Sequence, residues 1–87
     1  MTLREPSAAE LPTLTQQAVL ALLLDAHPGQ WSVDEVAREM TDRLDEFAAR
    51  DRIDNAIRDL VGAGLVHRHG MFVFATRAAV RFEELRI

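Results

Sequence analysis

The sequence predicts one domain of the α+β class, mainly α, in which three helices form a core and a β-hairpin packs beside them. Three observations predict this fold. Apolar residues recur at every third or fourth position in several separate segments, which is the period of an amphipathic helix. Gly64 follows the third such segment, at a position where helices commonly end. Two short runs suited to β-strands come next, joined around His69-Gly70.

The composition sets the bounds of this prediction. Eighty-seven residues make one domain, near the size at which a single core is just sufficient. With 48% hydrophobic and 28% charged residues, the chain is globular rather than disordered. The absence of cysteine excludes disulfides and thiolate metal sites. We expect no signal peptide and no membrane contact, because the longest apolar run, 18–24, is too short to span a bilayer, and we therefore expect a cytoplasmic protein.

The charge is unevenly distributed along the chain. The formal net charge is −4, and all ten basic residues are arginine. Residues 1–44 contain three arginines against seven acids, whereas residues 45–87 contain seven of each. Most DNA-binding domains have a basic face, because phosphate contacts supply much of their affinity. An acidic total does not exclude a local basic patch, and the neutral C-terminal half is where one could form.

The first helix follows an N-terminal arm, residues 1–12, that has no sustained apolar period. We expect the helix to begin at Thr13, with Gln16 completing a capping box, and to end at Ala26 or His27. The domain proper is then residues 13–87.

The apolar arc of this helix is wider than one buried face requires. Leu20 and Leu24 extend it sideways from the face that includes Val19 and Leu23. The arm or the last helix could cover the additional leucines. Alternatively, they form a dimer interface, since large exposed apolar patches usually mark a contact.

The second helix, predicted at 33–42, has the clearest start. Ser32 is a candidate N-cap with Glu35 three residues later, and Trp31 and Val36 occupy the positions of a hydrophobic staple. Gln30-Trp31 could add a third strand to the hairpin. Trp31 is then a core anchor or, alternatively, an aromatic recognition residue on the surface.

The third helix is predicted at about 47–63. Its apolar face does not continue the phase of the second helix, so the chain must break between about Thr41 and Asp51. At its end Gly64 can adopt the left-handed conformation of a Schellman cap, which would bring Leu65 against Leu60.

The hairpin strands are predicted at 65–68 and 71–75. Because so short a hairpin is marginal alone, it must lay one face on the helix before it. Thr76 is then expected to cap a last helix, Arg77 to about Arg86, in which Val80 and Phe82 point in different directions.

Few residues could support catalysis. The three histidines and the scattered carboxylates have no catalytic spacing, and no glycine-rich loop opens a helix to hold phosphate. His67 and His69 would lie on one side of a strand, where they could hold a metal or simply be solvated, and a third ligand is not apparent. We therefore predict that the protein is no enzyme and has no metal site and no cofactor.

Nucleic-acid binding has more support. In a helix-turn-helix the second helix of the motif enters the major groove and reads base edges. The outward residues of the third helix suit this role, because Asn55 can pair with adenine and Arg52 or Arg58 with guanine. Arg68 on the hairpin could contact phosphate or the minor groove. Alternatively, the same face is solvated and held by ion pairs such as Asp54–Arg58.

Three segments carry a resemblance to a known superfamily: WSVDEVAREM, RIDNAIRDLVGAGLV and HRHGMFVFAT. They resemble the first motif helix, the recognition helix and the wing of winged helix-turn-helix domains in small bacterial transcription regulators, over about residues 13–76. The resemblance implies a DNA-binding domain with contacts at Arg52, Asn55, Arg58 and Arg68. We expect double-stranded DNA as a partner and a homodimer formed through the first helix and the C-terminal helix. The alternative is a protein-interaction module that keeps the scaffold and does not bind DNA.

Overall fold

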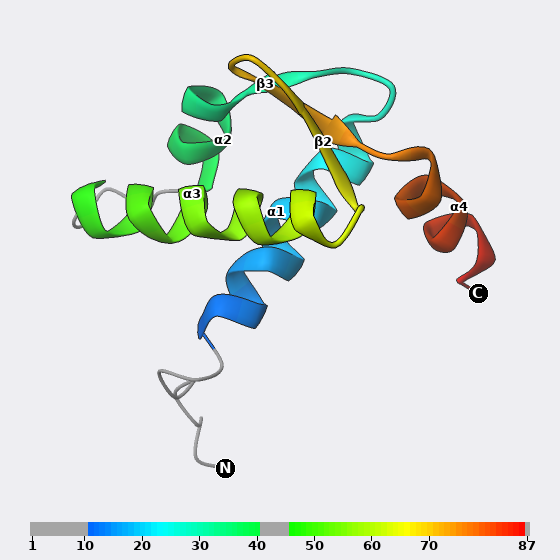
Figure 1. The fold of residues 1–87 in the computed structure, drawn as a ribbon, viewed down its shortest axis with the longest axis horizontal. Coiled ribbons are helices and arrows are strands. Elements are labelled where there is room, and N and C mark those ends of the chain that lie inside the picture. Colours follow the sequence, from blue (N-terminus) through cyan, green and yellow to red (C-terminus); the bar gives the residue numbers. More distant parts are fainter. Residues whose placement is uncertain (1–10, 41–45, 87) are drawn as a thin grey trace, which may run out of the picture.

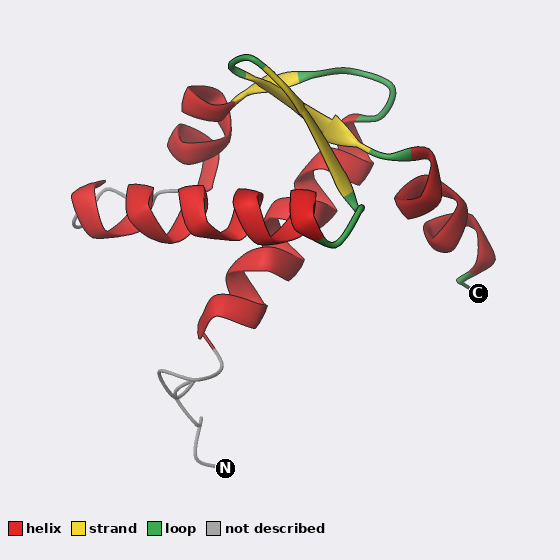
Figure 2. Cartoon of the chain, viewed as in Figure 1, coloured by secondary structure: helices red, strands yellow, loops and turns green. Residues whose placement is uncertain are grey.

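The computed structural model of the chain describes residues 11–40 and 46–86, and this part is mainly helical (Figures 1 and 2). Over these residues it confirms an α+β fold with four helices and a small antiparallel sheet. The elements are, in chain order, α1 (Leu11–Ala26), β1 (Trp31–Ser32), α2 (Val33–Met40), α3 (Glu46–Gly62), β2 (Val66–His69), β3 (Phe72–Ala75) and α4 (Arg77–Leu85). The strand order is β1-β3-β2. The break expected between about Thr41 and Asp51 does not fall within residues 46–51, which already belong to α3, and residues 41–45 lie outside the described residues.

The core forms where α1 and α3 cross beneath the sheet (Figure 1). Every helix and both long strands contribute apolar side chains to it, and no polar or charged side chain is buried among the described residues. The buried members of this cluster are Val19, Leu23, Val33, Val36, Ala37, Ile53, Ala56, Ile57, Leu60, Val66, Val73, Ala75 and Ala79. The hairpin therefore lays one face on α3 and α1, which is how a ribbon this short becomes stable.

The start of α1 differs from the prediction. The helix already includes Leu11 and Pro12, so Thr13 lies inside it and is not its N-cap. Proline suits the first turn of a helix, because the N–H that it lacks would have no partner there. Thr15 donates its hydroxyl to the Leu11 carbonyl, and Gln16 reaches across to Asp59 on α3 at 3.2 Å. The predicted Thr13–Gln16 capping box is therefore wrong.

The start of α2 agrees with the prediction. The Ser32 hydroxyl accepts the Glu35 N–H at 3.0 Å, and the Glu35 carboxylate accepts the Ser32 N–H at 3.1 Å, which is a complete capping box. Trp31 is half-buried against the core, as expected of an anchor, and pairs with Val73 in the sheet. The third strand is therefore present, at Trp31–Ser32 rather than at Gln30-Trp31.

The end of α3 is the predicted Schellman cap. Gly64 has a φ of +79°, and the Leu65 N–H donates to the Leu60 carbonyl at 3.0 Å, while the Gly64 N–H donates to Val61 at 3.0 Å. The hairpin that follows is shifted by about one residue. Its two-residue turn is Gly70-Met71, with Gly70 at a φ of +62°, because glycine adopts a positive φ without a Cβ clash.

The last helix is capped at its start, packs on the core through one face and leaves its other face exposed. Thr76 caps α4 as predicted, and its hydroxyl accepts the Ala79 N–H. Val80 packs against the core, but Phe82 and Leu85 are 64% and 60% exposed. Within the described residues, no helix combines the length and apolarity needed to cross a membrane.

Candidate functional site

A groove of about 420 Å³ lies between α3 and β2. Its lining is distinctive because it contains three arginines and a single acid in a chain whose net charge is −4. The lining residues are Arg50, Asp54, Asn55, Ile57, Arg58, Val61 and Arg68. The structure thus brings together three of the four residues predicted to contact DNA, namely Asn55, Arg58 and Arg68, and adds Arg50.

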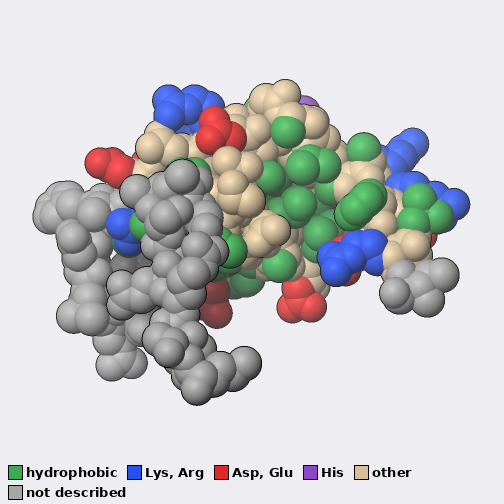
Figure 3. All heavy atoms as spheres, turned by 90° about the horizontal axis from the view of Figure 1, so that it is seen from below, with side chains coloured by type: hydrophobic (Ala, Val, Ile, Leu, Met, Phe, Trp, Pro, Cys, Tyr) green, Lys and Arg blue, Asp and Glu red, His purple; other side chains and the backbone are tan. Residues whose placement is uncertain are grey.

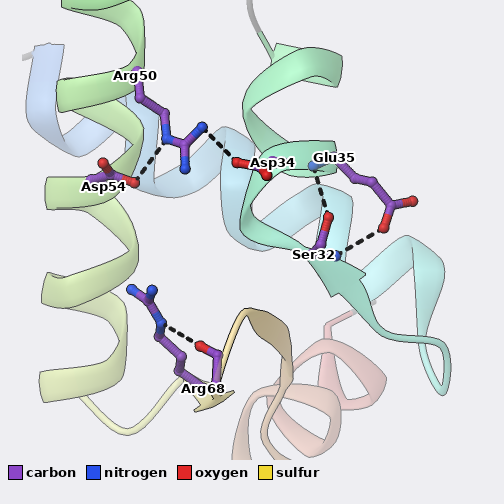
Figure 4. A network of polar contacts seen from close by, with 7 residues as sticks. Ser32, Asp34, Glu35, Arg50, Asp54 and Arg68 are labelled. Carbon is purple, nitrogen blue, oxygen red and sulfur yellow. Dashed lines mark hydrogen bonds and ion pairs between the residues drawn. The ribbon is translucent and has the colours of Figure 1, made fainter.

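Arg68 reaches the groove because of the strand register. It pairs with Val73, whose side chain is fully buried, so both lie on the sheet face that packs on the helices. Its Nε donates to the carbonyl of Gly70 at 3.0 Å, and Figure 4 shows the guanidinium directed towards α3. This bond fixes the side chain by its Nε and leaves the two terminal nitrogens able to donate to a ligand.

Arg58 and Asn55 interact with each other in the groove. The Arg58 guanidinium donates to the side-chain oxygen of Asn55. The oxygen of an asparagine amide has two lone pairs, so Asn55 can hold Arg58 with one of them and keep the other. Asn55 therefore orients Arg58, and its own contact with adenine stays a prediction. The predicted Asp54–Arg58 ion pair is wrong, because Asp54 pairs with Arg50.

Arg50 connects two helices at one end of the groove (Figure 4). Its guanidinium lies 2.8 Å from the carboxylate of Asp34 on α2 and 3.3 Å from that of Asp54 on α3. The hydrogen bond to Asp34 raises the pKa of Arg50 above its ordinary value, and Asp54 adds to this effect. The (i, i+4) spacing of Arg50 and Asp54 is visible in the sequence and could have predicted their ion pair. The pairing of Arg50 with Asp34 could not be predicted in this way, because it depends on how α2 packs against α3.

Arg52 lies outside the groove. It lines a neighbouring hollow between α3 and the start of α1, together with Leu11 and Pro12, and Asn55 lines both the hollow and the groove. Asp59 lines the same hollow and accepts a hydrogen bond from Gln16 of α1. The crossing of the helices thus divides the charges predicted for one face of α3. Arg52 and Asp59 turn towards α1. The groove between α3 and β2 keeps Arg58, together with Arg50, Arg68 and the single acid Asp54.

The two hairpin histidines lie on the opposite face of the sheet from Arg68. His67 pairs across the strands with Phe74, with ring centroids 5.1 Å apart, and His69 pairs with Phe72. Over residues 11–40 and 46–86, no three histidine or acidic side chains gather closely enough to hold a metal ion. The imidazoles here are aromatic neighbours of phenylalanine on an exposed ribbon.

No protein-family model, no curated protein and no solved structure matches this chain. The assignment of a function therefore depends on the geometry of the groove and of the remaining surface.

Proposed function

We propose that this chain is a winged-helix DNA-binding domain that acts as a homodimer in transcriptional control. In this proposal α3 is the recognition helix and the β2–β3 hairpin is the wing. The observation that carries the proposal is the groove between them, which is lined by Arg50, Arg58 and Arg68 and by one acidic residue, Asp54. A local excess of arginine in an acidic chain is what a phosphate-binding surface requires.

Each arginine of the groove has its own role in this proposal. Arg58, held by Asn55, presents its guanidinium to a base edge in the major groove, where a bidentate contact to guanine is the commonest specific one. Arg68 donates its terminal nitrogens to a backbone phosphate next to the wing. Arg50 is engaged by Asp34 and Asp54, so it holds α2 against α3 and adds positive charge without a free donor fork.

The experiment measures binding of a labelled duplex by fluorescence anisotropy over a series of salt concentrations. The first probe is a pool of duplexes with random sequence. The second probe is the set of duplexes that the wild-type chain enriches from this pool. Arg68→Gln is expected to weaken binding to all duplexes and to reduce the slope of log K against log salt by about 0.9, the value for one lost phosphate contact. Arg58→Gln is expected to weaken binding mainly to selected sequences, by about 5- to 150-fold, as for one lost base contact.

Arg52→Gln is the matched control. It removes the same charge from the same helix, but Arg52 lies in the hollow beside α1 rather than in the groove. We expect it to change affinity much less than either groove variant does. The proposal is wrong if the wild-type chain binds no duplex at low salt, or if Arg52→Gln has the same effect as Arg68→Gln.

A protein-interaction module is the second candidate, and one observation favours it. The large side chains of Phe82 and Leu85 are more than half exposed on α4, which is unusual for a helix with no further role. Under this alternative the domain associates through α4 and α1 and does not bind DNA. Absence of duplex binding together with stable self-association would select it.

A further inference from the structure

Arg50 and Arg68 lie towards opposite ends of the groove, and the structure holds both in the same way (Figure 4). The Nε of Arg68 donates to the Gly70 carbonyl at 3.0 Å, and the Nε of Arg50 donates to the carboxylate of Asp54 at 3.3 Å. Each guanidinium is therefore anchored through Nε, and its two terminal nitrogens remain as further donors. The difference between the two arginines is Asp34, whose carboxylate lies 2.8 Å from Nη1 of Arg50.

The contact between Arg50 and Asp34 is easily broken. The side chains of the two residues are 40% and 50% exposed, so water screens their attraction. Exposed ion pairs of this kind change an equilibrium by about fivefold at most. Asp34 also lies in the first turn of α2, where the helix dipole stabilises a negative charge even without a partner. The free chain therefore loses little stability when Arg50 leaves Asp34.

A DNA backbone offers Arg50 a stronger partner than Asp34 does. A phosphate can accept both terminal nitrogens of a guanidinium at once, and such bidentate pairs are the strong ones. Neutralising a phosphate also releases the counterions condensed on it, which raises affinity at low salt. The face seen from below shows apolar side chains gathered over one area, with charged side chains mainly around it (Figure 3), whereas the groove brings three arginines together. The groove is therefore the surface on which a phosphate backbone meets Arg50.

The spacing of the arginines along α3 suits this exchange of partners. Arg50 and Arg58 are eight residues apart, which is about 12 Å along the helix. A strand of duplex DNA has one phosphate for about every 3.4 Å of the helix axis. A strand that follows the groove past Arg58 and Arg68 therefore also places a phosphate near Arg50.

We propose that Arg50 exchanges Asp34 for a backbone phosphate when the domain binds DNA, so that Asp34 competes with DNA for this arginine. In the complex Arg50 keeps Asp54 as its anchor and donates its terminal nitrogens to the phosphate, as Arg68 does. Asp34 then lowers the affinity for every duplex alike, because phosphate contacts carry no sequence information. This inference rests on the proposed function and adds to it a regulating residue on α2, outside the lining of the groove.

The first test needs no DNA and measures the strength of the ion pair in the free chain. A double-mutant cycle of Asp34→Asn and Arg50→Gln, followed by urea denaturation, gives the coupling between the two side chains. We expect a coupling of about fivefold or less in the unfolding equilibrium, and salt should reduce it further. A coupling above about tenfold would overturn the inference, because it would exceed the range of exposed pairs and hold Arg50 on Asp34.

The second test measures duplex binding by the same two variants over a series of salt concentrations. Arg50→Gln is expected to reduce the slope of log K against log salt by about 0.9, the value for one lost phosphate contact. Asp34→Asn is expected to tighten binding to random and selected duplexes by the same factor, up to about fivefold, because Arg50 no longer has to leave a partner. In a chain that already carries Arg50→Gln, Asp34→Asn should tighten binding less, because there is no guanidinium to release.

Glu39→Gln is the matched control for Asp34→Asn. It removes the same charge from the same helix at an exposed residue that does not line the groove. We expect it to change the affinity less than Asp34→Asn does. If the wild type binds duplexes but Arg50→Gln leaves the slope unchanged, or if Asp34→Asn and Glu39→Gln act alike, this inference is wrong and the proposed function stands. If neither the wild type nor Asp34→Asn binds any duplex, the proposed function fails and this inference fails with it.

Discussion

Thr76 joins the end of α3 to the start of α4, and its hydroxyl is the subject of the first prediction. The hydroxyl donates to the carbonyl of Gly64 at 2.7 Å and accepts the N–H of Ala79 at 3.2 Å. The first bond reaches the Schellman cap of α3, and the second satisfies a free donor in the first turn of α4. The backbone at Thr76 is extended, with φ −73° and ψ 162°, a conformation that valine adopts readily. Thr76→Val therefore removes the hydroxyl and leaves shape and backbone unchanged.

The expected loss follows from the two bonds. Removal of an N-cap hydroxyl costs about 1 kcal/mol. The bond to Gly64 adds about 0.5–1 kcal/mol, near the low end for a hydrogen bond, because Gly64 is exposed and water can replace the lost donor. The free energy of unfolding should therefore fall by about 1.5–2 kcal/mol. For a domain of this size each kcal/mol lowers the Tm by about 4–8 °C, so the expected decrease is about 6–16 °C.

Urea denaturation followed by circular dichroism measures this change, and thermal melts provide the second estimate. Thr76→Ser is the matched control, because it keeps the hydroxyl and loses only a half-buried methyl group worth less than about 1 kcal/mol. If Thr76→Val and Thr76→Ser are equally stable, the hydroxyl does not connect the two helices and the reasoning fails.

Two further predictions concern the caps of α2 and α3. The hydrogen bond from the Ser32 N–H lowers the pKa of Glu35 below its ordinary value of 4.5. A carboxyl group with a lowered folded pKa stabilises the fold above its ordinary pKa, and this contribution disappears as the pH falls through the lowered value. The excess stability of the wild type over Glu35→Gln, measured by urea denaturation, should therefore be present at neutral pH and vanish in acid, and a difference that is constant with pH would contradict this. In α3, an added Cβ meets nothing within 4 Å at Gly62 or at Gly64, but only Gly64 has a positive φ. Thermal melts should show Gly62→Ala stabilising by about 0.5–1 kcal/mol and Gly64→Ala destabilising by about 1–2 kcal/mol, and changes of the same sign would refute this explanation.

The charge distribution explains how an acidic chain can expose a basic groove. Of the charged residues of α3, Arg52 and Asp59 turn towards α1, and Arg58 turns towards β2. The groove also receives Arg68 from β2, a separate element that lies beside α3. A net charge summed along the sequence averages over these faces, so it is a poor guide to the local potential.

The sequence by itself determined the local features of this fold. The Ser32–Glu35 capping box, the Gly64 cap and the Thr76 cap each involve residues within a few positions of one another, so short-range spacing specifies them. The helical period of α3 also predicted a buried face of five apolar residues, and four of them are buried: Ile53, Ala56, Ile57 and Leu60. The fifth, Val61, is 39% exposed, so that part of the prediction was wrong. The start of α1 was predicted wrongly, although Pro12 in the first turn was a local signal for it.

Only the tertiary structure decided which charged side chains meet. Asp54 had an arginine four residues away on either side, and it pairs with Arg50 because Asp34 of α2 lies within reach of the same guanidinium. Arg68 belongs to the groove because its strand register directs it to the inner face of the sheet. A long charged side chain can reach several oppositely charged neighbours along its own helix. The way α1, α3 and the sheet cross decides which of these contacts forms. The candidate site is therefore a product of packing, whereas the elements that carry it are a product of sequence.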